Sequence, residues 1–369
     1  MRRLIKYFRR IFIFIACAGL IVLLISSFSN RVSPLTNIYL PYFGLFFPFI
    51  LAFNLAFFFL WLIAKQWKQA GITLLIFIIC WGSISTYFPL HRPTKDIPDD
   101  CIKILTYNVM RFDYLRRHKP DSPNPIVQYV IDQDPDIVCF QEFGASTVNQ
   151  KELMLSDLLT AFNRLPYHQI EPLKFPYPSQ VFGLAVFSKF PILSLRPIPI
   201  GSSYNGSFIA ELDIHGRTVC LVNNHLESNK ISPDERSDYY NLTKEPDTQK
   251  LEAFTHFMFQ RLSPAYRIRA KQGEMISAYI REKPHPYVIV CGDFNDTPLS
   301  YARYKIKGDL NDAFAESGCG MGITFNRYRF LFRIDYILHS KNIKAYNCTV
   351  GRLKDSDHYP VWTYLQFLD

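Results

Sequence analysis

Long apolar stretches dominate the start of the chain, and shorter alternating patterns follow them. Three uninterrupted apolar stretches occur at Ile11–Phe28, Phe43–Ile63 and Ile72–Phe88. Each is about long enough to cross a hydrocarbon layer about 30 Å thick as an α-helix. The pattern therefore predicts a membrane anchor of three transmembrane helices over residues 1–91. A signal peptide is the alternative for the first stretch, because basic residues precede it.

Beyond a polar, proline-containing linker at 92–100, short strands and helices alternate, which predicts a domain over 101–369. Strands are expected at Ile102–Asn108, Asp136–Gln141, Gly183–Ser188, Ile192–Arg196, Ser207–Ile214, Arg217–Asn224, 288–291, Arg333–His339 and Pro360–Phe367. Helices are expected at 123–133, 150–160, 247–262 and 265–282. The strands flanking 189–191 and 215–216 are predicted to pair as hairpins. Loops are predicted at 228–246, 300–312 and 318–322.

The charge distribution supports the predicted anchor and gives it an orientation. Residues 1–91 contain eight of the 41 basic residues and none of the 32 acidic residues, so the net charge of +9 belongs almost entirely to this segment. Basic residues cluster before the first apolar stretch and between the second and third, which places residues 1–10 and 64–71 in the cytoplasm. We therefore expect a multi-pass protein of the cytoplasmic membrane, with its larger domain on the extracytoplasmic side.

The eight cysteines leave the redox compartment open. Three lie in apolar, strand-like runs and are interpreted as buried thiols: Cys139, Cys220 and Cys291. Three others could pair in an oxidising compartment: Cys101, Cys319 and Cys348. The cysteines and histidines do not have the spacing of a zinc site.

The clearest chemical signal follows the apolar run at 288–291. Gly292 allows a sharp turn close to a ligand, and Asp293 and Asn295 come directly after it. Two residues apart on extended backbone, these side chains point to the same side. A carboxylate that orients water beside a neutral amide donor suits a phosphate ester. An ordinary turn is the alternative interpretation, because Gly-Asp and Asn-Asp are common turn pairs.

Other predicted strands also end in polar groups, namely Asn108, Glu142, His225, Asp335 and the pair Asp357-His358. A single such residue is ordinary, since isolated Glu and His side chains are mostly surface or packing residues. In order, the motifs are Tyr-Asn-Val (107–109), Gln-Glu (141–142), Ser-Lys-Phe-Pro-Ile (188–192), Asn-His-Leu (224–226), Gly-Asp-Phe-Asn (292–295), Arg-Ile-Asp-Tyr-Ile (333–337) and Ser-Asp-His (356–358). Together they resemble the endonuclease/exonuclease/phosphatase superfamily, the deoxyribonuclease-like metal-dependent phosphoesterases, over residues 100–369.

The resemblance implies an α+β fold, a four-layer sandwich of two mainly antiparallel sheets flanked by helices. It implies that Glu142 is the principal ligand of Mg²⁺ or Mn²⁺, with Asn108 and Asp357 completing the site directly or through water. The chain departs from the family pattern at Asn224, where many members carry Thr. The substrate-facing edge is therefore expected to be specific to a branch of the family.

The resemblance also implies catalytic roles. Asp293 would position and activate the attacking water, while Asn295 and Asn108 would hold phosphoryl oxygens. Asp335 would orient His358, which then serves as a base or as a cationic phosphate clamp. His225 would contact the scissile phosphate or protonate the leaving oxygen.

The substrate class stays open between nucleic acid and a phospholipid or small phosphodiester. The near-neutral charge of 92–369 weighs against a nuclease, although Arg261, Arg267, Arg269 and Lys271 cluster in sequence. A lipid bilayer is the expected partner of the predicted helices, which weighs toward a lipid or small phosphodiester substrate. A membrane-tethered, non-catalytic binding or sensing domain on the same scaffold is the alternative function. The oligomeric state is left undetermined.

Overall fold

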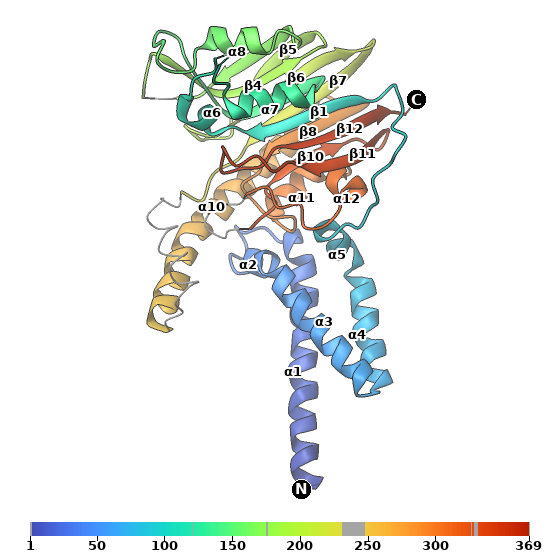
Figure 1. The fold of residues 1–369 in the computed structure, drawn as a ribbon. Helices are drawn as coiled ribbons and strands as arrows, with labels where there is room; N and C mark the ends of the chain where they lie inside the picture. The colour runs from blue at the N-terminus through green and yellow to red at the C-terminus, as the bar shows by residue number, and fades with distance from the viewer. Residues whose placement is uncertain are drawn as a thin grey trace.

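The structure, a computed structural model, describes residues 2–119, 121–174, 176–230, 248–325, 327 and 331–368. Figure 1 shows a layered domain of strands and helices, with apolar helices of the N-terminal segment projecting from one end of it. The predicted insertion at 228–246 falls almost wholly outside the described residues.

Two six-stranded sheets form the centre of the larger domain. The first contains, in spatial order, β11 (Ile343–Val350), β12 (Val361–Phe367), β1 (Ile102–Asn108), β2 (Ile137–Ser146), β4 (Gln180–Ser188) and β3 (Tyr167–Pro172). The second contains β5 (Ile192–Ile198), β6 (Gly206–Ile214), β7 (Arg217–His225), β8 (Tyr287–Asp293), β10 (Asp335–His339) and β9 (Asn311–Asp312). Each sheet has one parallel pair, β1 with β2 and β7 with β8, and its other pairs are antiparallel.

The sheets pack face to face over a continuous apolar core. Alternate residues of the central strands point into it, among them Ile104 and Cys139 from the first sheet and Leu221 and Ile289 from the second. The outer face of the first sheet is covered by α7 (Pro125–Gln133) and α8 (Leu155–Ala161). The second is covered by α10 (Thr248–Glu282) and α11 (Tyr301–Lys307). The expected α+β sandwich of two helix-flanked sheets is therefore confirmed.

Several local structures differ from those that the sequence pattern predicted. β4 and β5 do not pair as a hairpin, because residues 189–191 carry the chain from one sheet to the other. The hairpin of β6 and β7 does form, with Ile214 opposite Arg217. The two helices expected at 247–262 and 265–282 are one helix, α10, with Pro264 exposed inside it. Elements that the pattern did not predict are β3, β9, β11, α11, the short α6 (Met110–Leu115) and α12 (Ala313–Ser317).

The N-terminal segment folds into α1 (Arg2–Phe28), a 3-10 turn (Ser29–Arg31), α2 (Leu40–Leu45), α3 (Phe47–Ile63), α4 (Trp67–Ile79) and α5 (Trp81–Tyr87). Within the part of the chain that the structure describes, one helix, over Tyr7–Arg31, is long and apolar enough to cross a membrane. The α4 and α5 helices qualify only together, across a 67° bend, and α3 has 17 residues. Length and composition thus support one spanning helix, or two, instead of the three expected. An N-terminal helix of this kind fits a membrane anchor or a signal sequence.

Specific contacts join these helices to one another. Buried Asn54 on α3 donates to the backbone oxygen of Gly19 on α1, at 3.1 Å. Arg9 donates to the side chain of Gln66 at 2.9 Å. Residues 9 and 66 therefore lie together, and Figure 1 shows that end of the helices pointing away from the sheets.

All eight cysteines are free. Cys139, Cys220 and Cys291 are buried, as their apolar surroundings predicted. No disulfide links Cys101, Cys319 and Cys348.

Candidate active site

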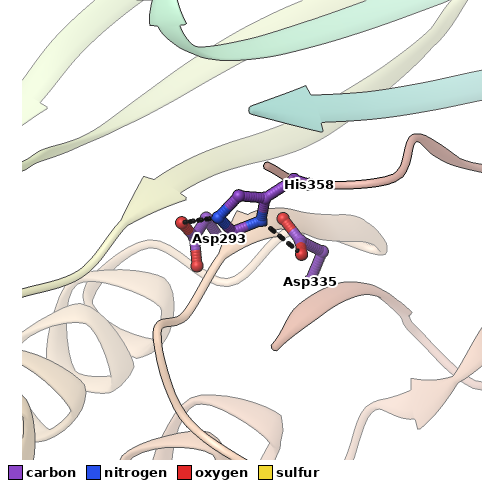
Figure 2. A group of neighbouring side chains, drawn as sticks. All are labelled: Asp293, Asp335 and His358. Carbon is purple, nitrogen blue, oxygen red and sulfur yellow. Dashed lines mark hydrogen bonds and ion pairs between the residues drawn. The ribbon is translucent and has the colours of Figure 1, made fainter. Parts of the chain in front are cut away.

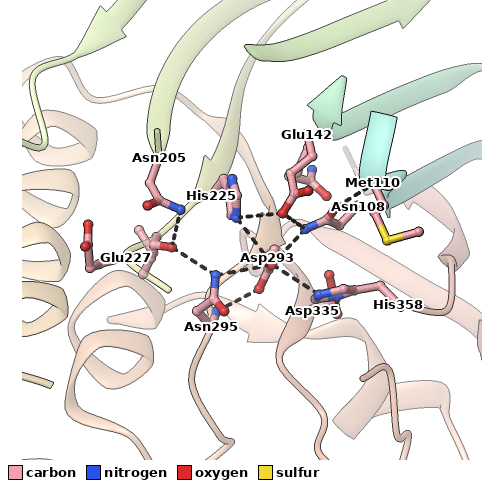
Figure 3. Close-up of polar contacts among 12 residues, drawn as sticks. Asn108, Met110, Glu142, Asn205, His225, Glu227, Asp293, Asn295, Asp335 and His358 are labelled. Carbon is pink, nitrogen blue, oxygen red and sulfur yellow. Dashed lines mark hydrogen bonds and ion pairs between the residues drawn. The ribbon is translucent and has the colours of Figure 1, made fainter. Parts of the chain in front are cut away.

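The central parallel pairs bring polar strand ends to one rim of the sandwich. Asn108 ends β1 next to Gln141 on β2, and His225 ends β7 next to Asp293 on β8. Because parallel neighbours end at the same edge, both sheets present polar groups there. Figure 3 shows Asn108, His225 and Asp293 converging, together with Glu142 of β2.

Asp293 lies at the centre of the group. In register it sits between His225 on β7 and Asp335 on β10. Its Oδ2 accepts a hydrogen bond from Asn108 Nδ2 at 3.1 Å and lies 3.6 Å from His225 Nε2 and 3.5 Å from His358 Nε2. The carboxylate is therefore surrounded by donors from both sheets.

Two unusual backbone conformations aim the carboxylates. Gly292 has φ 124°, and a Cβ at this position would lie 2.0 Å from the backbone oxygen of Asn224. Only glycine fits so close to the neighbouring strand. Glu142 has φ 48° at a break in register between β2 and β4, where the strand bulges. Such a bulge redirects a side chain, here into the site.

Asp335 and His358 form a hydrogen-bonded pair, which Figure 2 shows beside Asp293. The distance from His358 Nδ1 to Asp335 Oδ2 is 2.9 Å. The hydroxyl of Thr324 accepts from the backbone N–H of Asp335 at 3.1 Å and so holds the strand start. Burial acts to lower the pKa of His358, but Asp335 and Asp293 outweigh it and hold that pKa well above its usual value.

Burial dominates the other titrating groups of the site. It raises the pKa of Asp293 to about 6, while the charge of His358 acts in the opposite direction. It lowers the pKa of His225. Burial, and then the neighbouring Asp357, raise the pKa of Glu142, although 33% of that side chain is exposed at the cavity floor.

The two amides orient the carboxylates. Asn295, with φ 51°, donates from Nδ2 to Leu226 O at 3.0 Å and to Asp293 Oδ2 at 3.3 Å, and its backbone N–H bonds to Asp293 Oδ1 at 2.8 Å. Asn108 Nδ2 also donates to Glu142 Oε1 at 3.2 Å, while its Oδ1 accepts from Met110 N. In this arrangement Asn108 turns its Nδ2 toward the two carboxylates, so metal ligation beside them through Oδ1 requires the amide to rotate.

All eight residues expected at the site meet in one place. Six line a cavity of about 320 Å³, namely Glu142, His225, Asp293, Asn295, Asp357 and His358. Asn108 and Asp335 contact them from behind.

The donor chemistry fits a divalent cation. Glu142 and Asp357 are carboxylates close enough to raise the pKa of Glu142, so a cation between them would relieve their repulsion. Their oxygens match the preference of Mg²⁺ or Mn²⁺. Asp293, Asp335 and His358 also form a compact buried cluster of ligand atoms. In that cluster both nitrogens of His358 face carboxylates, which favours a hydrogen-bonded relay over a metal centre.

Sequence reasoning missed a supporting layer. Arg269 is buried and bonds to Asp296 Oδ2 at 3.0 Å and to Glu227 O at 2.9 Å. It therefore braces the loop after β8 and does not contribute to the basic patch that its sequence neighbours predicted.

Ser356 donates to the backbone oxygen of Asn108 at 2.7 Å. In the sequence, this role of Ser356 was indicated only by its position in the Ser-Asp-His motif.

A family profile described as "Endonuclease/Exonuclease/phosphatase family" matches residues 105–358, more than half of the chain. The chain belongs to the endonuclease/exonuclease/phosphatase family. Its members are hydrolases of phosphate ester bonds and generally depend on a divalent metal, so this domain is an enzyme of that class. A second profile, for a domain of unknown function, matches residues 9–87.

Several solved structures are similar to the chain at low identity. A family protein from Beutenbergia cavernae is 15% identical, covers 73% of this chain and 72% of its own, and has a TM-score of 0.49. A family protein from Leptotrichia buccalis is 16% identical; the match covers 72% of this chain and 100% of that protein, with a TM-score of 0.49. The human Nocturnin catalytic domain with bound sulfate is 16% identical; the match covers 75% of this chain and 99% of that domain, with a TM-score of 0.48. No curated protein matches significantly. The family assignment therefore rests on the profile match.

Proposed function

We propose that this protein is a membrane-anchored, metal-dependent phosphodiesterase. The observation that carries the proposal is the convergence of Glu142, Asp293 and His358 on one cavity floor. Their carboxylates and imidazole supply the metal-binding and proton-handling groups that phosphodiester hydrolysis requires.

Each residue then has a distinct role. Asp293 orients and deprotonates the attacking water, and Asn295 and Asn108 hold Asp293 in place through the hydrogen bonds described above. Asp335 orients His358, whose Nε2 faces the cavity beside Asp293. His225 contacts the scissile phosphate or the leaving oxygen. The same amides of Asn108 and Asn295 are placed to bind phosphoryl oxygens once substrate displaces a carboxylate contact.

Mg²⁺ or Mn²⁺ would be held by Glu142, with Asp357 and Asn108 bound directly or through water. Bound there, the ion would neutralise charge on the phosphoryl oxygens. Because the site is lined by carboxylates, an anionic phosphodiester would otherwise be repelled.

We propose further that α1, α3 and the α4–α5 pair all enter the membrane. Their outer surfaces expose large apolar side chains, such as Phe14 at 74%, Phe49 at 70% and Ile63 at 79%, which is unfavourable in water. The contact of Arg9 with Gln66 supports an arrangement in which residues 1–10 and 64–66 share one side. The positive-inside rule makes that side cytoplasmic and the catalytic domain extracytoplasmic.

The first test is hydrolysis of bis-p-nitrophenyl phosphate by the full chain in detergent. We expect release of p-nitrophenol that requires Mg²⁺ or Mn²⁺ and is abolished by chelator. Glu142→Gln and His358→Ala should each lower turnover at least about a hundredfold, as for a positioned acid–base group. Glu282→Gln, at an exposed position on α10, is the matched control and should keep full turnover. If the protein released no p-nitrophenol in a metal-dependent way, this result would contradict the phosphodiesterase proposal and favour the non-catalytic binding or sensing domain.

A further inference from the structure

The active-site cavity is lined by two chemically different groups of side chains. The polar catalytic groups form what we call the floor. The other group is apolar and consists of Leu45, Met258, Leu262, Phe325, Phe332 and Ile334. We call these six residues the apolar wall. A phosphodiester alone needs only the floor, so the wall indicates a second, hydrophobic part of the substrate.

The apolar wall comes from three separate segments. Leu45 belongs to α2, Met258 and Leu262 to α10, and the remaining three residues to the chain before β10. Leu45 precedes the matched catalytic family region at 105–358. The N-terminal segment therefore contributes directly to the active-site cavity.

The contact of α2 with the catalytic domain is close and specific. Tyr42 stacks on Phe259 of α10, with ring centroids 5.4 Å apart and planes 19° from parallel. Its hydroxyl lies 2.8 Å from Ser263 Oγ. A Cβ on Gly44 would lie 2.8 Å from Leu299 O, so α2 approaches the catalytic domain at van der Waals contact. This docking holds Leu45 at the cavity.

The charges around the cavity do not favour a polyanion. Apart from the catalytic histidines, the described cationic residues of the lining are Lys230 and Arg269. Lys230 lies 2.7 Å from Glu227, and Arg269 is buried against Asp296. Nucleic-acid grooves instead use free basic side chains to follow successive phosphates.

We infer that the substrate is a lipid phosphoester, whose phosphate binds on the polar floor and whose hydrocarbon chain lies on the apolar wall. The inference rests on the proposed phosphodiesterase function and adds its substrate class. Figure 1 shows α2 where the apolar helices meet the catalytic domain, so the part of the apolar wall that α2 contributes lies on the side from which a bilayer lipid would enter. Leu45 and Met258, both half-buried, are then specificity-determining residues.

The test compares two diesters that share one reactive group, methyl p-nitrophenyl phosphate and hexyl p-nitrophenyl phosphate. They are assayed with the full chain in lipid nanodiscs. We expect kcat/KM to be at least about tenfold higher for the hexyl ester, since each methylene buried on an apolar surface contributes measurably. Leu45→Gln and Met258→Gln should reduce this ratio severalfold. Ile268→Gln, on the exposed part of α10 outside the cavity, should leave it unchanged and so corrects for partition into lipid.

The outcomes separate the inference from the function on which it rests. Hydrolysis of neither ester, with or without Mg²⁺, overturns the phosphodiesterase and the lipid inference together. Equal kcat/KM for both esters, or a ratio that Leu45→Gln and Met258→Gln leave unchanged, overturns the lipid inference alone. Faster cleavage of a single-stranded oligodeoxynucleotide than of the hexyl ester would also overturn the lipid inference and would indicate a nuclease.

Discussion

At the scale of single residues, the site depends on one imidazole between two carboxylates. His358 bonds to Asp335 through Nδ1 at 2.9 Å and faces Asp293 through Nε2 at 3.5 Å. Asp335 does not line the cavity, so its effect on substrate passes through His358. In the proposed mechanism Asp335 is therefore a positioning residue, as the carboxylate is in a catalytic Asp-His pair.

Replacing Asp335 with Asn should separate positioning from binding. The amide keeps the shape of the side chain but removes the charge that holds His358 in one orientation. We expect kcat to fall about a hundredfold or more while KM changes little. Steady-state kinetics at saturating Mg²⁺ measure both. A rise in KM with unchanged kcat would place Asp335 in substrate binding instead.

At the scale of elements, the ends of strands carry backbone strain next to the site. One residue after Asn108, the six residues of α6 all have positive φ, from 45° to 65°, and such a left-handed turn costs about 1–2 kcal/mol per residue. Burial of Phe112 against Phe140 and Phe143 offsets part of this cost. The turn also lays Arg111 across Gly144, near Glu142.

Gly292 provides a direct test of the close approach between β7 and β8. Gly292→Ala adds a methyl group that overlaps Asn224 O and would displace Asp293. Gly216→Ala is the matched control, because Gly216 also has positive φ, at 82°, but has open space around it. We expect the control to lose about 1–2 kcal/mol of stability and keep its activity. Gly292→Ala should lose more stability and most of its turnover, measured by thermal melting and by hydrolysis. Equal effects of the two variants would rule out the overlap as the cause.

At the scale of the whole molecule, a buried ion cluster lies where the N-terminal helices meet the catalytic domain. Asp312 contacts Arg303 and lies 3.5 Å from Arg333, which donates to the backbone oxygen of Thr86 on α5. The two arginines keep the pKa of Asp312 below its usual value despite burial. Arg333 therefore links this charge cluster to α5 of the N-terminal segment through a hydrogen bond to a backbone carbonyl.

Asp312→Asn leaves two buried arginines without their carboxylate, which should cost about 3 to 5 kcal/mol. Because the folded-state pKa of Asp312 is depressed, its contribution is complete above the unfolded pKa of about 3.9 and is lost as pH falls toward the folded value. The difference in melting temperature between wild type and variant should therefore be largest near neutral pH and shrink below about pH 4. A difference that is constant with pH would show that charge is not the cause.

The proposed orientation of the whole protein can be tested by limited proteolysis. Protease added to spheroplasts should digest residues 92–369, because the positive-inside rule places this part outside the cytoplasm. Immunoblotting with a tag at the N-terminus or at the C-terminus shows which end of the chain is exposed to the protease. Full protection in intact spheroplasts, with digestion after lysis, would reverse the orientation.

The sequence alone identified the family and predicted the residues that converge at the candidate site, because these residues lie in short motifs at strand ends. Asp293 and Asn295 follow a buried strand in any fold that contains it, and Gly292 marks the close approach. Local periodicity also predicted β1 at its observed bounds and the hairpin of β6 and β7, whose two-residue turn leaves one pairing possible.

Only the tertiary structure decided which elements meet. The strands flanking 189–191 look like a hairpin in sequence but belong to different sheets, since register between distant strands is set by core packing and not by local pattern. Arg269 looked like part of a basic patch, yet it is buried against Asp296. The entry of Leu45 into the cavity is likewise invisible in sequence, because it requires α2 to dock on α10 more than two hundred residues away. Contacts of such separation depend on the whole folded chain, and they define the shape of the site.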